Sequence, residues 1–151
     1  DVQDEDLEIK WEPIHDLLYT LICISFFADQ EIDKSEKSAI YNTFVRFAPD
    51  TDENLFNKFF KLATNKFIEL QSDEKRENQY ILSLKLVKEE FSADDKMLIE
   101  IVQSFIEIAN ADEFIHENEI LLINEAIKTW DIKRELTKDR NNNKLQLINL
   151  S

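Results

Sequence analysis

The chain has 151 residues, a formal net charge of −14, no glycine and only two prolines. This length suits a single domain with one core. The low content of glycine and proline disfavours the tight turns of β-rich folds. The negative charge argues against nucleic acid and membrane surfaces as ligands, since both are bound through lysine and arginine, and leaves basic or membrane-associated proteins and cations as partners.

The chain begins with an acidic extension, residues 1–12, which is followed by an apolar run over residues 17–27. The first six residues, Asp-Val-Gln-Asp-Glu-Asp, are acidic where a signal peptide is basic, and the apolar run is shorter than the ~20 apolar residues that cross a bilayer. We therefore expect a cytoplasmic protein without direct membrane insertion. The single cysteine, Cys23, lies inside the run, which predicts a buried, reduced thiol.

Apolar residues at helical spacing predict a first helix over about residues 14–28, buried on most sides. A polar stretch, residues 29–33, leads to a second helix, in which Asp33 and Glu36 form a capping box. A third helix follows Pro49, with Thr51 or Asp52 as its N-cap.

The second half of the chain continues the helical pattern. Ser72 or Asp73 begins a fourth helix, residues 92–95 begin a fifth, and a polar stretch at residues 112–116 leads to a sixth. Beyond it, residues 132–138 predict a further short helix, residues 141–143 break it, and residues 144–151 form either a loose tail or a docked strand. We thus predict an all-α domain of six to seven helices over residues 13–138, with a C-terminal tail at 139–151.

A repeated motif relates the two halves of this domain. A shift of 83 residues (111 − 28) aligns two copies of one pattern, in each of which a buried helix, an acidic connection and an amphipathic helix follow one another. The aligned residues are Ala28, Asp29, Ile32, Glu36 and Ile40 in the first copy and Ala111, Asp112, Ile115, Glu119 and Ile123 in the second. This pattern predicts a duplicated helical hairpin around a pseudo-twofold axis.

The pattern Ala-Asp-x-x-Ile-x-x-x-Glu at the end of an apolar helix, present twice, resembles the TerB-like family of tellurite-resistance and stress-associated proteins. That family includes the N-terminal domain of a membrane-anchored DnaJ-type co-chaperone. The resemblance covers about residues 17–130 and implies a helical domain of the TerB type. The sequence departs from the family at Gln30 and Glu113, where a glycine usually follows the aspartate.

The acidic connections are the candidate ligand sites. The first carries four carboxylates within eight residues, and the second adds a histidine, a set of donors that suits a divalent cation such as Ca²⁺, Mg²⁺, Zn²⁺ or Mn²⁺. These residues are Asp29, Glu31, Asp33 and Glu36 in the first connection and Asp112, His116 and Glu119 in the second. They form no EF-hand, because Lys34 and Ile40 occupy the places of the required Gly and bidentate Glu.

A structural interpretation competes with the metal hypothesis. Helix capping accounts for Glu36 and Glu119, whereas Asp29 and Asp112 follow a helix C-terminus, where the macrodipole disfavours negative charge. Residues 105–127 contain no lysine or arginine. Compensation within the second connection must then come from the backbone, His116 or a bound ion.

No nucleophile elbow, phosphate-binding glycine loop or zinc-protease motif occurs in the sequence, so we do not expect an enzyme. The resemblance implies a non-catalytic interaction or sensor domain linked to tellurite resistance or stress response. Two alternatives stay open: a metal-dependent hydrolase that uses Asp112, His116 and Glu119, and a purely structural spacer within a larger protein.

Overall fold

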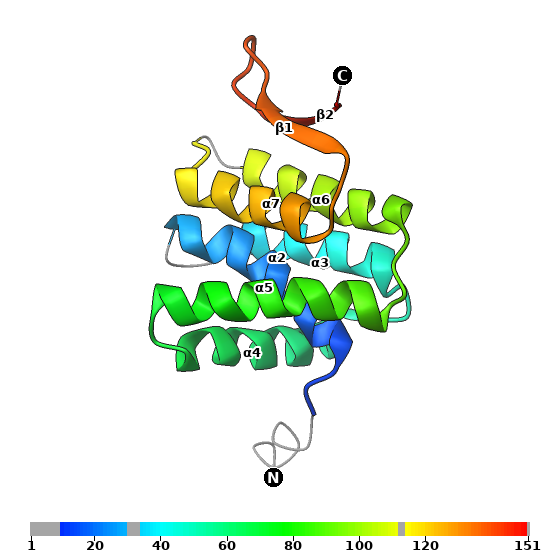
Figure 1. The fold of residues 1–151 in the computed structure, drawn as a ribbon. Coiled ribbons are helices and arrows are strands. Elements are labelled where there is room, and N and C mark those ends of the chain that lie inside the picture. The colour runs from blue at the N-terminus through cyan, green and yellow to red at the C-terminus, as the bar shows by residue number, and fades with distance from the viewer. Residues whose placement is uncertain (1–9, 30–33, 112–113, 151) are drawn as a thin grey trace.

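A computed structural model describes residues 10–29, 34–111 and 114–150, with the backbone alone for residues 26–29 (Figure 1). Six helices and a two-stranded hairpin make up this part of the chain, which confirms the all-α class. They are α2 (Pro13–Asp29), α3 (Lys34–Phe47), α4 (Glu53–Glu69), α5 (Asp73–Glu90), α6 (Asp95–Asn110), α7 (Glu117–Thr129), β1 (Arg134–Lys138) and β2 (Leu145–Asn149). None of these helices has the length and apolar character needed to cross a membrane.

Helix α2 is the centre of the domain, and it contacts all five of the other helices. Figure 1 shows α2 and α3 between the pair α6 and α7 on one side and the pair α5 and α4 on the other. The described apolar side chains of α2 from Leu17 to Ile24 are fully buried. A helix that is apolar on every side is stable only when other elements surround it, so the predicted central position is confirmed.

The repeat seen in the sequence is also a repeat in the structure. Helices α3 and α7 begin at equivalent positions, Lys34 and Glu117, and the equivalent residues Ile40 and Ile123 are both fully buried. Helix α2 contacts α7, and α3 contacts α6. This crosswise packing agrees with two hairpins related by a pseudo-twofold axis.

Short polar side chains begin three of the helices, as expected from the sequence. Each has extended backbone and accepts a hydrogen bond from the N–H of the third residue after it, which satisfies one of the free donors at the helix start. The three N-caps are Asp52, Ser72 and Asp94, with bonds of 2.8, 3.2 and 2.8 Å to Leu55, Lys75 and Met97.

The region after α7 differs from the prediction. The expected helix over residues 132–138 is wrong: Asp131 has a φ of 51°, which ends α7, and the chain continues as β1, paired with β2 in an antiparallel hairpin. Leu136 lies opposite Leu147, and both pack against the core, while Leu145 is buried. Burial of this alternating face outweighs the weak helical pattern, and residues 145–149 form the docked strand that the sequence left as one of two options.

Candidate functional site

The first acidic connection lies largely outside the described residues. The side chain of Asp29 and the whole of Glu31 and Asp33 belong to the part that the structure does not describe. Glu36 lies in the first turn of α3 and is buried, at 8% exposed. The proposed cluster of four carboxylates therefore stays a prediction.

The second connection shows how one predicted ligand is used. Glu119 is fully buried in the first turn of α7, and its Oε1 accepts a hydrogen bond of 3.0 Å from the N–H of His116, the N-cap residue. The His116 side chain is exposed, and Asp112 lies outside the described residues. Glu119 thus acts as the third residue of a capping box, which accounts for its position in the motif.

A metal centre is not visible in the described part of the chain. Among those residues, no group of three or more histidine, cysteine, aspartate or glutamate side chains converges as a metal would require. The side chains of Asp29, Glu31, Asp33 and Asp112 are outside the described part of the chain. Binding of Ca²⁺, Mg²⁺, Zn²⁺ or Mn²⁺ at the connections therefore stays a prediction.

The hairpin supplies a positive charge to the end of α6. The Nζ of Lys144 lies 3.4 Å from the carbonyl oxygen of Asn110, the last residue of that helix. A cation near the last carbonyls of a helix is favourable, so Lys144 offsets the negative end of α6. Residues 105–127 contain no lysine or arginine, and this cation comes from 34 residues further along the chain.

The same residue, Asn110, fastens the hairpin. Its side-chain amide donates to the carbonyl oxygen of Leu145 at 2.9 Å and accepts from the N–H of Leu145 at 2.8 Å. Next to this anchor, an open cavity of about 540 Å³ has Phe114 and Ile115 on one side and Lys138 and Lys144 on the other. Residues 114–115 of the second connection and the hairpin therefore line the same cavity.

Two titratable residues are buried at the start of α2. His15 is 1% exposed, and its Nδ1 accepts a 2.8 Å bond from the N–H of Glu12, while its ring packs on Trp11 and Phe59. Burial lowers the pKa of His15. Because Nδ1 is an acceptor, the neutral ring carries its proton on Nε2. His15 therefore caps the start of α2, which begins at Pro13.

Asp16 is the second buried group. It is 2% exposed, and its Oδ1 accepts a 2.7 Å hydrogen bond from the hydroxyl of Ser83 on α5. Burial raises the pKa of Asp16, and the bond from Ser83 opposes that shift. This bond ties α2 to α5 within the core.

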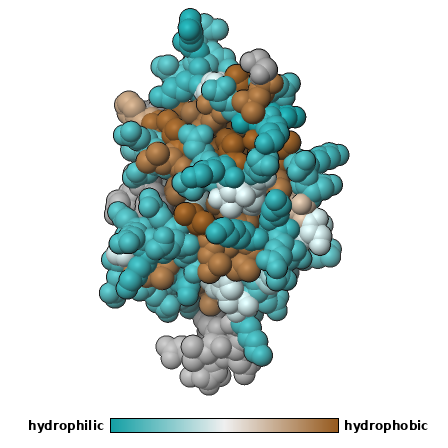
Figure 2. All heavy atoms as spheres, in the orientation of Figure 1, coloured by the Kyte–Doolittle hydropathy of each residue, from teal (hydrophilic) through white to brown (hydrophobic). Residues whose placement is uncertain are grey.

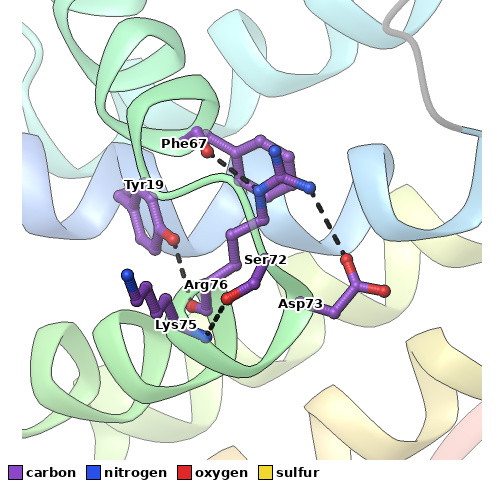
Figure 3. A network of polar contacts seen from close by, with 6 residues as sticks. All are labelled: Tyr19, Phe67, Ser72, Asp73, Lys75 and Arg76. Atoms are coloured by element: carbon purple, nitrogen blue, oxygen red, sulfur yellow. Dashed lines mark hydrogen bonds and ion pairs between the residues drawn. The ribbon is translucent and has the colours of Figure 1, made fainter.

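A polar network fixes the turn between α4 and α5 (Figure 3). The guanidinium of Arg76 lies 4.4 Å from the ring centre of Phe67, its Nε donates to the Phe67 carbonyl oxygen at 2.9 Å, and Asp73 lies 3.5 Å from its Nη1. The Tyr19 hydroxyl donates to the Arg76 carbonyl oxygen at 3.0 Å. This network stabilises the turn.

Cys23 lies on α2, the same helix as Tyr19, and is fully buried. Burial raises the pKa of its thiol. The predicted buried thiol is therefore confirmed.

Comparisons with curated proteins and with solved structures give no match. The family model described as tellurite resistance protein TerB matches residues 15–139. The match begins inside α2 and ends just after β1, so β2 lies beyond it, whereas Asn110, which anchors β2, lies within it. With most of its length matched, and with the duplicated helical hairpin in place, the chain belongs to the TerB family.

Proposed function

We propose that this chain is a non-catalytic TerB-type interaction domain that binds a basic partner protein in the cytoplasm, as part of tellurite resistance or a wider stress response. The family supports the domain type. Glu119 supports the non-catalytic assignment, because its buried carboxylate caps α7, whereas a hydrolase would need it beside an accessible metal.

The observation that carries the proposal is the charge of the domain. The chain has 32 acidic and 18 basic residues. Of the acidic side chains that the structure describes, all except Asp16, Glu36 and Glu119 are exposed or half-buried, and the net charge of −14 gives the chain a negative potential. Such a potential attracts basic proteins, speeds their association and repels acidic competitors.

Binding to peptides of opposite charge tests this proposal. We expect a lysine-rich helical peptide to bind the chain in low salt, and a glutamate-rich peptide of equal length to show no binding by fluorescence anisotropy. Raising the salt from 50 to 300 mM should weaken the interaction at least tenfold, because the screening length shortens. Equal binding of both peptides, or no binding of either at 50 mM salt, would contradict the proposal.

In the native host, removal of the chain should increase sensitivity to tellurite.

A divalent cation at the acidic connections would make the domain responsive to ions. The test is calorimetric titration of the EDTA-treated chain with Ca²⁺, Mg²⁺, Zn²⁺ and Mn²⁺, with Asp112→Asn and Glu119→Gln as variants. Micromolar binding that both substitutions abolish would support an ion site. Absence of heat, together with lower stability of the Glu119→Gln chain, would leave capping as the whole role of Glu119.

A further inference from the structure

Helices α5 and α7 form a stiff pair with a groove between them. Tyr80 of α5 donates a hydrogen bond of 2.6 Å to the carbonyl oxygen of Leu122 in α7. In the opposite direction, the indole Nε1 of Trp130, just after α7, donates at 2.8 Å to the carbonyl oxygen of Leu84 in α5. Both aromatic side chains are buried, so these two reciprocal bonds hold the helices at a fixed separation.

One end of this groove combines apolar walls with acidic edges. A cavity of about 210 Å³ lies between Ile81 on α5 and Leu121 on α7, and Glu77 and Glu125 border it. Leu121 is 55% exposed although it lies in the middle of a helix. Neither carboxylate forms an ion pair with a described basic residue, so both are available to a partner.

The other end of the groove is basic. A second cavity, of about 370 Å³, lies between α5 and the end of α7 and is lined by Lys85, Lys88, Thr129 and Trp130. Glu89 also lines it, so its charged residues are two lysines and one glutamate. The two cavities follow each other along both helices, which run in the same direction (Figure 1). Figure 2 shows hydrophobic side chains among hydrophilic ones on this face of the molecule.

We propose that the groove between α5 and α7 binds an amphipathic helix of the partner protein. The helix would place an aliphatic side chain against Leu121, lysine or arginine beside Glu77 and Glu125, and acidic residues beside Lys85 and Lys88. Along α5, Glu77 precedes Lys85 and Lys88 by 8 and 11 residues, which is about 12–16 Å in a helix. An apolar stripe of that length, read at positions i, i+3 or i+4, and i+7, is the usual form of a helix bound in a groove.

The inference rests on the proposed function, because it assigns a location to the binding of a basic partner. Charge complementarity selects the occupant: the acidic edges favour the basic end of a helix, and Lys85 and Lys88 disfavour a uniformly basic one. A partner that is attracted only by the overall negative charge of the chain would need neither an apolar stripe nor a reversal of charge along its helix.

Two helical peptides of identical composition and net positive charge distinguish these cases. The first has an apolar stripe with lysines at one end and glutamates at the other, and the second has the same residues scrambled so that no stripe forms. We expect the first to bind the full chain at least tenfold more tightly by fluorescence anisotropy. Methyl NMR spectra should show shift changes at Leu121 and Ile81 in the unmodified protein.

Matched variants locate the site. Leu121→Lys and Glu125→Lys should each weaken binding of the striped peptide at least tenfold. Ile68→Lys, at a helical aliphatic residue with 54% exposure, and Glu100→Lys, at an exposed glutamate on α6, should change it less than twofold. If the scrambled peptide binds equally and all four variants act alike, the groove is wrong and the proposed electrostatic function stands. If neither peptide binds in low salt, both proposals fail.

Discussion

The two repeated hairpins, α2–α3 and α6–α7, share their motif but differ in their surroundings. Five helices enclose α2, whereas the hairpin strands contact α6 and α7. At equivalent positions, α2 buries His15 and Asp16, and α6 carries Leu98 and Ile99. The motif therefore determines where the helices end and which of their residues face the core. The neighbours of each unit determine whether the other positions carry titratable or apolar side chains.

Truncation of an equivalent core residue in each unit tests this contrast most strongly. Leu18 in α2 and Ile101 in α6 are both fully buried, so each change to alanine should lower the free energy of unfolding by about 2–5 kcal/mol. We expect Leu18→Ala to cost more, because more elements pack around α2. Urea unfolding measures both, with Leu55→Ala at a 40% exposed position as the control, and a larger loss at Ile101 would reverse the comparison.

The anchor of the hairpin belongs to the second unit alone. Asn110→Ala removes both hydrogen bonds to Leu145, and at about 0.5–1.5 kcal/mol each it should lower stability by about 1–3 kcal/mol. Hydrogen exchange of the β2 amides should become faster. Asn141→Ala, at an exposed position in the turn, is the control. Unchanged exchange in the Asn110 variant would mean that packing of the Leu145 side chain holds the strand alone.

The features that sequence reasoning predicted are local ones. Asp52, Ser72 and Asp94 act on N–H groups three residues away, so the helix starts were readable from the sequence. Strand β1 was not readable, because it pairs with β2, and β2 is anchored by Asn110, 35 residues before Leu145. The α5–α7 groove was equally hidden, since it exists only where the fold brings Tyr80 and Leu122 together.

The buried histidine should make the first unit sensitive to acid. The pKa of His15 is lowered in the folded protein from the ordinary value of 6.5, mainly by burial, and Glu12 and Asp16 oppose the shift. Below pH 6.5 the unfolded chain therefore takes up a proton first, and the free energy of unfolding falls until the folded protein also protonates His15. His15→Asn, which retains an acceptor, should remove this loss in pH-dependent unfolding curves. His116→Asn, at the exposed histidine, should retain it.

Asp16 should act in the opposite direction at lower pH. Burial raises its pKa above the ordinary 3.8, and Glu90 adds to the shift. Between the raised pKa and pH 3.8 the folded protein takes up the proton before the unfolded chain does. The contribution of Asp16 to the free energy of unfolding therefore increases as the pH falls through this range. Asp16→Asn should abolish that gain relative to an exposed control, Asp50→Asn. A steeper loss of stability in unmodified protein than in the Asp16→Asn chain over this range would contradict the assignment.

Helix α7 of the second unit and helix α5, which lies outside both units, end in the same way. Without glycine, the chain places Ser92 and Asp131 in the left-handed region, with φ values of 46° and 51°. Each is followed by a residue whose N–H bonds five residues back, Ala93 to the Lys88 oxygen at 3.0 Å and Ile132 to the Ile127 oxygen at 2.9 Å. These are Schellman ends, where glycine is the usual residue.

Substitution by glycine at either position should raise stability modestly. A non-glycine residue in the left-handed region costs about 1–2 kcal/mol, which a glycine would avoid. Glycine also increases the entropy of the unfolded chain, which cancels part of this benefit, so we expect a net stabilisation of about 0.5–1 kcal/mol. Thermal unfolding should show a rise of about 1–4 °C for Ser92→Gly. Lys58→Gly, within α4, should instead lower stability by about 0.5–1 kcal/mol. A loss of stability for Ser92→Gly would mean that the serine side chain contributes more to the helix end than its backbone strain removes.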